Sequence, residues 1–201
     1  MKTARFEIRT DLALEEREGL KERAKEVSGV SFRKWKGKTE DVQITEVKVL
    51  NETGAETLGK PVGSYLTLEA DRLLLPDEDF HSEVSDELAN VLKELAEHAL
   101  GKNESEEKEN SFLHSQPVIL VAGLGNQSVT PDSLGPRTVN NLSVSQNETG
   151  LKAIAPGVMA QTGMETARIL SGIIREIKPD LVIAIDALAA RSIRRLGTTI
   201  Q

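Results

Sequence analysis

The chain has 201 residues, no cysteine and three histidines, and its formal net charge is −7. The lack of cysteine excludes disulfides, thiolate nucleophiles and cysteine-based metal sites. The acidic balance argues against a general affinity for nucleic acid or anionic membranes, and an aromatic content of 3% is too low for base-stacking surfaces. An apolar content of 38% suits a globular protein with a modest core.

The first part of the chain predicts a helix followed by two strands. Residues 12–27 are rich in Glu and Lys, which favours a helix. Residues 41–50 (DVQITEVKVL) and 63–70 (GSYLTLEA) alternate apolar and polar positions, as strands do. In the first of these strands the alternation shifts between Ile44 and Val47, which indicates a β-bulge.

A second helix is predicted at SDELANVLKELAEHALG, residues 85–101. Its apolar residues recur on one face at Leu88, Val91, Leu92, Leu95 and Ala99. Ser85 is the expected N-cap and Gly101 the expected stop. The polar and charged stretch 101–116 predicts a linker or surface loop.

From residue 117 onward, short apolar runs alternate with amphipathic stretches. The predicted strands are 117–124 (PVILVAGL), 151–159 and 181–187 (LVIAIDA), the first and last of them buried. The predicted helices start at about Pro131 and at the capping-box stretch 162–165, the second running to about Ile177. This order predicts an α/β fold with a parallel sheet and right-handed crossovers. The last residues, GTTIQ, look like the start of another strand, so we expect a C-terminally truncated piece of a longer domain.

Three predicted strand ends are rich in Gly, Ala and Ser: GLGNQSVTPD, APGVMAQTG and IDALAARS. Sites in open parallel sheets form beyond the carboxyl ends of the strands, so these segments predict one crevice. Two of them deliver an aspartate, Asp132 and Asp186. Two neighbouring carboxylates can divide acid–base work, one taking a proton from water and the other donating one to the substrate.

Each of these features also has a structural interpretation. Asp132 near the start of a helix is favoured by the helix dipole and is equally explained as a cap. Asp186 is harder to explain in this way, because small and apolar residues surround it and a buried carboxylate is costly. Arg137 and Arg191 follow the two aspartates; they are suited to an acidic substrate, or to pairing with surface carboxylates.

Other chemistries fit the sequence poorly. Gly123 and Gly125 match the first two glycines of a dinucleotide fingerprint, but Ser128 occupies the third position. The chain has no P-loop lysine and no nucleophile elbow. Ser192 has no histidine nearby, and the three histidines lie outside the glycine-rich segments, which disfavours a serine triad. We therefore predict neither a nucleotide cofactor nor a metal.

The segments GLGNQSVTPDSLGP, APGVMAQTGMET and PDLVIAIDALAARSIRRLGTTIQ together closely resemble the spore germination protease family. The stretches IRTDLALEE and TEVKVLNETGAETLGKPVGSYLTLEA also resemble it, so the likeness covers most of the chain. The resemblance implies a cytoplasmic endopeptidase of the spore core that starts the degradation of small acid-soluble spore proteins at germination. It implies a three-layer α/β/α fold with a mostly parallel sheet, similar to hydrogenase-maturation endopeptidases, and an atypical aspartic-type mechanism that uses Asp132 and Asp186.

The resemblance carries further expectations. The enzyme would be an autoprocessed zymogen cleaved near Asp11–Leu12, with residues 1–11 as the propeptide and 12–201 as a single protease domain. It would assemble as a homotetramer, without direct contact to nucleic acid or membrane. The residues expected to line the substrate crevice are Gly123, Gly125, Asn126, Thr162, Gly163 and Arg191.

Two alternatives remain at this point. One is a metal-sensing endopeptidase of the hydrogenase-maturation type, which the absence of histidine from the crevice segments disfavours. The other is a non-enzymatic ligand-binding α/β module in which the aspartates only cap helices.

Overall fold

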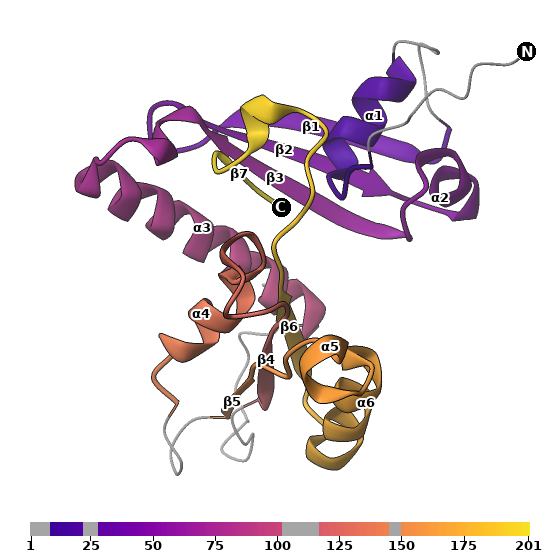
Figure 1. Cartoon of the computed structure of the whole chain (residues 1–201). Coiled ribbons are helices and arrows are strands. Elements are labelled where there is room, and N and C mark those ends of the chain that lie inside the picture. The colour runs from indigo at the N-terminus through magenta and orange to yellow at the C-terminus, as the bar shows by residue number, and fades with distance from the viewer. Residues whose placement is uncertain (1–8, 22–27, 102–116, 145–149) are drawn as a thin grey trace, which may run out of the picture. The chain divides into compact units, whose positions relative to one another are not determined.

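The computed structural model describes residues 9–21, 28–101, 117–144 and 150–201 (Figure 1). The chain divides into two compact units, the first formed by Met1–Leu92 together with Leu188–Gln201 and the second by Lys93–Ala187. Both units contain helices and strands, so the fold is mixed α/β, as predicted. The assignment of one protease domain to residues 12–201 stays a prediction.

The first unit is built on an antiparallel sheet. Its described strands, in the order β1-β2-β3-β7, are β1 (Val30–Lys36), β2 (Val42–Val49), β3 (Gly63–Ala70) and β7 (Thr199–Ile200). The prediction of a strand at 63–70 is confirmed, and GTTIQ does contribute a strand, which pairs with β3. The expectation of a mostly parallel sheet fails for this unit.

The predicted bulge in β2 is wrong. Its pairing with β1 and with β3 runs without interruption along the whole strand. The alternation shifts because the two halves of β2 bury opposite faces of the sheet. Val42 and Ile44 pack on one face, whereas Val47 and Val49 pack on the other.

Helices cover both faces of this sheet. They are α1 (Ala13–Lys21), α2 (Glu52–Leu58) and α3 (Glu78–Ala99). Phe80 and Val84 of α3 join the core on the Ile44 face, and Ala13 of α1 and Leu58 of α2 join it on the Val47 face. Residues 22–27 of the predicted first helix lie outside the described residues.

The helix α3 begins earlier than the sequence predicted. Asp77 precedes its first turn, and the Asp77 carboxylate accepts a hydrogen bond from the Phe80 backbone N–H at 3.1 Å. Ser85, the predicted N-cap, lies inside the helix, where its hydroxyl donates to the His81 carbonyl at 2.7 Å. Gly101 adopts a φ of 71° just beyond the helix, which confirms it as the stop. Most of the predicted linker, 102–116, lies outside the described residues.

The second unit contains the predicted parallel sheet. Its described strands, in the order β5-β4-β6, are β4 (Ile119–Gly123), β5 (Leu151–Ile154) and β6 (Leu181–Ile185). Its helices are α4 (Leu134–Asn140), α5 (Met159–Thr162) and α6 (Thr166–Ile177), and a short 3₁₀ turn, Thr130–Asp132, precedes α4. The alternation of strands and helices thus predicted this unit correctly.

Two details of the second unit differ from the prediction. Thr162 ends α5 instead of opening α6, because Gly163 turns the chain with a φ of 69° and Glu165 is the N-cap of α6. The strand β6 is not buried: its residues alternate between half-buried and exposed, because it lies at the edge of the described sheet. Among the described strands of this unit, only β4, between its two neighbours, is almost wholly buried.

A buried carboxylate connects α1 to the C-terminal part of the first unit. Glu15 is 3% exposed and accepts hydrogen bonds from the backbone N–H groups of Arg191 and Ser192 and from the Arg195 guanidinium. Burial raises the pKa of Glu15, but hydrogen bonds from Thr10 and from these groups outweigh it and hold the pKa below its usual range. Glu15 is thus more acidic in the folded protein than in the unfolded chain.

This shift predicts acid-sensitive stability of the first unit. A group whose pKa is lowered by folding stabilises the fold above its unfolded pKa, and that contribution is lost as the pH falls through the folded value. Below about pH 4.3, we expect the free energy of unfolding to fall more steeply in the parent protein than in Glu15→Gln. Urea unfolding from pH 7 down to about 3 measures this, with Glu56→Gln, an exposed position on α2, as the control. Parallel pH curves for parent and Glu15→Gln would contradict the prediction.

Candidate active site

The loop that follows β4 turns back on itself, so that Asn126 near its start bonds to Asp132 near its end. The half-buried Asp132 accepts a hydrogen bond from the Asn126 backbone N–H through both its carboxylate Oδ2 and its carbonyl oxygen, each at 2.9 Å. Its own backbone N–H donates to the Val129 carbonyl. The N-cap of α4 is Ser133, and it makes no side-chain capping bond. Asp132 therefore braces the loop before the helix and does not cap the helix itself.

Two predicted glycines are required by this loop. Gly125 has a φ of 111°, and a Cβ there would lie 2.1 Å from the Asp132 carbonyl oxygen. At Gly123, a Cβ would lie 2.2 Å from the carbonyl oxygen of Gly135. Both positions exclude any side chain because the opposing atoms are backbone. The result is a tightly packed backbone around Asp132, in which Gly123 is buried.

The start of α4 packs directly on the ends of β4 and β6. A Cβ on Gly135 would meet the carbonyl oxygens of Leu124 and Ile185, each at 2.4 Å. The Leu124 N–H also donates to the Ile185 carbonyl at 2.8 Å. Asp186 directly follows Ile185, the last residue of β6, and Asp132 lies in the loop after β4. Both aspartates therefore lie at the carboxyl end of the parallel strands. The two residues that the sequence singled out thus follow neighbouring strands of this sheet, and their joint role stays a prediction.

This close packing predicts a large cost for one methyl group. Gly135→Ala is expected to destabilise the protein by about 3 kcal/mol or more, since both opposing groups are backbone and cannot move aside. Gly172→Ala is the control: no atom lies within 4 Å of a Cβ at this position of α6, so the change should be neutral or stabilising. Thermal unfolding of the two variants measures the difference. Equal stabilities would contradict the packing described here.

Asp186 is exposed, which corrects the expectation of a buried carboxylate. Its Oδ1 accepts a hydrogen bond from the next backbone N–H, that of Ala187, at 2.8 Å. The apolar neighbours in the sequence misled the prediction because β6 is an edge strand whose alternate positions face outward. An exposed carboxylate at this edge is accessible to water and to a substrate chain.

The second glycine-rich segment is joined to the first through a residue that the sequence analysis missed. The Gln161 amide donates to the Asn126 side-chain oxygen at 2.9 Å. Thr162 accepts from the Met164 backbone N–H and so shapes the turn between α5 and α6, while Gly163 has no atom within 4 Å of a Cβ position. Its long polar side chain, in a stretch of mostly small or apolar residues, is the sequence feature that could have identified Gln161.

The other predicted residues lie in the first unit. The Arg191 guanidinium pairs with Glu16 at 3.1 Å, so its proposed role with an acidic substrate stays a prediction. Leu12 is 3% exposed, and the Asp11 carbonyl oxygen accepts from the Lys60 ammonium at 2.9 Å. The proposed processing point is therefore folded into the unit.

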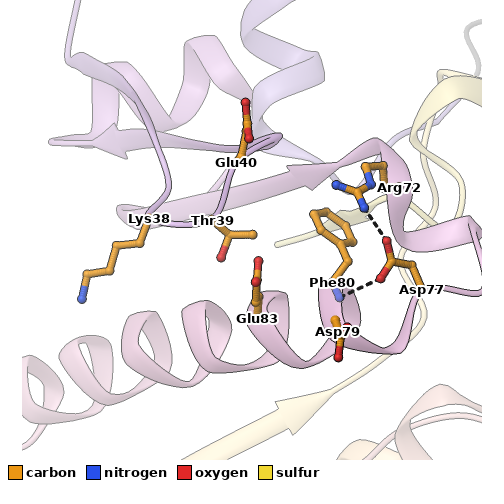
Figure 2. Close-up of a pocket in the computed structure, with 8 residues that line it drawn as sticks. All are labelled: Lys38, Thr39, Glu40, Arg72, Asp77, Asp79, Phe80 and Glu83. Atoms are coloured by element: carbon orange, nitrogen blue, oxygen red, sulfur yellow. Dashed lines mark hydrogen bonds and ion pairs between the residues drawn. The ribbon is translucent and has the colours of Figure 1, made fainter.

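The first unit also has a polar pocket of about 680 Å³ that the sequence did not predict (Figure 2). It is lined by Lys38, Thr39, Glu40, Arg72, Asp77, Asp79, Phe80 and Glu83. The Asp77 carboxylate accepts hydrogen bonds from the Phe80 N–H and from the Arg72 guanidinium, which hold its pKa below the usual range. With charges of both signs and the Asp77 carboxylate already paired, this pocket is a poorer candidate for acid–base chemistry than the carboxyl end of the parallel sheet.

The described residues offer neither a metal-binding cluster nor a membrane-spanning helix. Within them, no three His, Asp or Glu side chains are grouped so that they could hold a metal ion. None of the described helices is both long and apolar enough to cross a membrane.

Comparison with known proteins gives the family. The family model described as germination protease matches residues 7–201. A germination protease of Caldanaerobacter subterraneus subsp. tengcongensis is 46% identical over 96% of this chain and 58% of its own length. One from Clostridium perfringens is 39% identical over 98% of this chain and 59% of its own length, and one from Bacillus mycoides is 39% identical over 98% and 54%.

These matches place the chain in a class of peptidases. The chain belongs to the germination protease family. It spans a little over half the length of the curated relatives that it matches.

Proposed function

We propose that the full-length protein is an endopeptidase that starts the degradation of small acid-soluble spore proteins in the spore cytoplasm during germination. The observation that carries this proposal is the position of Asp132 and Asp186 at one edge of the parallel sheet, in a chain of this family. Neither a metal nor a cofactor has a part in it.

The two carboxylates divide the chemistry of peptide hydrolysis. One, ionised, takes a proton from the attacking water, and the other, protonated, donates a proton to the carbonyl oxygen or the leaving amine. The brace from Asn126 fixes Asp132, whereas Asp186 faces solvent, where water enters. Gly123 and Gly125 shape the loop that holds Asp132, because they pack against the backbone of Gly135 and Asp132. The substrate main chain can approach closely over Gly163, where no atom lies within 4 Å of a Cβ position.

The protein is also expected to be processed at its N-terminus and to form an oligomer, as the resemblance to the family implies. Residues 1–11 act as a propeptide removed by cleavage between Asp11 and Leu12, and the mature domain begins at Leu12. The parallel sheet and its helices belong to a three-layer α/β/α domain, and the enzyme forms a homotetramer. Mass spectrometry of the purified precursor held at mildly acid pH tests the processing step, and an N-terminus that stays intact under all conditions counts against it.

The function is tested by incubating the full-length protein, begun at Leu12, with a small acid-soluble spore protein and following cleavage by mass. We expect discrete internal cleavage that excess chelator leaves unchanged. Loss of cleavage in chelator would favour the metal-sensing alternative. An absence of cleavage, with a ligand still bound, would favour the non-enzymatic module.

A further inference from the structure

The strand β1 is an outer strand of the antiparallel sheet in the first unit. Among the described strands it pairs only with β2, and this pairing runs without a bulge from Val30 to Lys36. Edge strands are commonly kept from pairing with other chains because they are short, bulged, interrupted by proline or charged. β1 is long, regular and free of proline, so its charged side chains are the one such feature that it has.

The register with β2 shows which backbone groups of β1 point away from the sheet. The Gly37 N–H donates to the Val42 carbonyl at 2.8 Å, so Gly37 is directed toward the paired strand. In an antiparallel ladder this direction alternates along the strand, and the odd-numbered residues of β1 share it. The N–H and C=O groups of Lys34 and Lys36 therefore point outward, where a further strand can bind them.

The side chains along this edge are basic. Residues 30–38 contain Arg33, Lys34, Lys36 and Lys38 and no acidic residue, in a chain whose formal net charge is −7. Arg33 pairs with Glu46 at 3.4 Å. Lys34 and Lys36 are exposed, and no described carboxylate forms an ion pair with either of them. These two ammonium groups can therefore pair with carboxylates from another chain.

A third cation lies on the same face of β1. Side chains alternate across a strand, so Lys34 and Lys36 share the face of Phe32, which packs against the core around Val47. The Arg17 guanidinium of α1 lies 3.4 Å from the centre of the Phe32 ring. Positive charge thus extends along this face of the strand. Opposite charges on neighbouring strands stabilise a sheet, whereas like charges directly opposite destabilise it.

We propose that the outer edge of β1 binds an extended acidic polypeptide segment, which adds to the sheet as a further strand over Lys34–Lys36 and places Asp or Glu side chains opposite these lysines. A second copy of β1 is a poor occupant, because it would bring like charges together. Nucleic acid is disfavoured by the negative net charge of the chain, and it has no backbone donors for the outward carbonyls. The inference concerns binding alone and does not depend on the proposed function.

The test measures binding of a short labelled peptide, in which Glu alternates with Thr, to the full-length protein by fluorescence anisotropy. We expect binding that weakens as salt is raised, and roughly tenfold or more weaker binding of the peptide with Lys in place of Glu. Lys34→Gln should weaken binding of the Glu peptide roughly threefold. Lys152→Gln removes the same charge from an exposed residue of β5 and should bind like the parent.

Lys34→Pro distinguishes strand addition from simple charge attraction. Proline is tolerated on an edge strand where the N–H faces outward, so the pairing of β1 with β2 should be kept, as thermal unfolding will show. Lys34→Pro and Lys34→Gln lose the same charge, but only the proline loses the outward N–H. Lys34→Pro should therefore weaken binding roughly tenfold or more. The same loss is expected for the parent protein with a Glu peptide that is N-methylated at alternate residues.

Each other outcome overturns the inference. Absence of binding by the parent, or equal binding of the N-methylated and unmodified peptides, would exclude strand addition, as would equal affinities of folded Lys34→Pro and Lys34→Gln. Single-stranded DNA that binds as tightly as the peptide would indicate only a cationic patch. A change of oligomeric state in Lys34→Pro would show that a second copy occupies the edge. The proposed function stands in all these cases, because it is tested by cleavage.

Discussion

Asp186→Asn is expected to lower kcat for peptide cleavage by about a thousandfold or more while leaving the protein folded. The structural cost is small because Asp186 is exposed and its one described bond, from the Ala187 N–H, can be kept by the asparagine oxygen. What is lost is a group that can exchange a proton with water or substrate. The measurement is single-turnover cleavage followed by mass, together with a thermal unfolding curve.

The matched control is Asp180→Asn, at the other end of β6. Asp180 is also exposed, and its carboxylate accepts from the Val118 N–H at 2.7 Å. We expect this variant to cleave at the parental rate. If Asp186→Asn cleaved as fast as Asp180→Asn, Asp186 would have no catalytic role.

Two substitutions of Asp132 are expected to separate its effect on cleavage from its effect on stability. Asp132→Asn keeps an oxygen that can accept from the Asn126 N–H, so the loop should stay braced while cleavage falls about a thousandfold or more. Asp132→Ala loses cleavage too, and because the Asn126 N–H then keeps only its bond to the carbonyl oxygen of residue 132, it should also be destabilised by about 0.5–1.5 kcal/mol. Unfolding and cleavage measured on the same samples distinguish the two effects.

The pair of variants decides between a brace and a catalyst. If Asp132 were only a brace, Asp132→Asn would cleave normally and Asp132→Ala would lose activity in proportion to its lost stability. Inactivity of a fully stable Asp132→Asn is what the catalytic interpretation requires.

Local patterns predicted the elements whose burial is set by neighbours close in sequence. The strand at 63–70 and the alternating strands and helices after residue 117 are such cases. The predictions failed where distant contacts decide burial. The sequence of β2 predicted a bulge because helices pack on both faces of this strand. The sequence of β6 predicted a buried strand, although β6 lies at the edge of the described sheet.

The candidate site was predictable in part for the same reason. Asp132, Asp186 and the glycines beside them follow from the rule that sites form at the carboxyl ends of parallel strands. The buried Glu15 of the first unit could not be found in this way, because it is one of several glutamates in a helix and its partners lie more than 170 residues further along the chain. Gln161 joins two loops by one side-chain bond, which no local pattern encodes.

The central claim is that Asp132 and Asp186 act as one catalytic unit, and a double-mutant cycle tests it most directly. The full-length protein begun at Leu12 is compared with Asp132→Asn, Asp186→Asn and the double variant, all shown to be folded, by the rate of cleavage of a small acid-soluble spore protein. Residues that act as a unit are strongly non-additive, so the double variant should be no slower than the slower single variant. Losses that multiply, or a single variant that cleaves at the parental rate, would contradict the account.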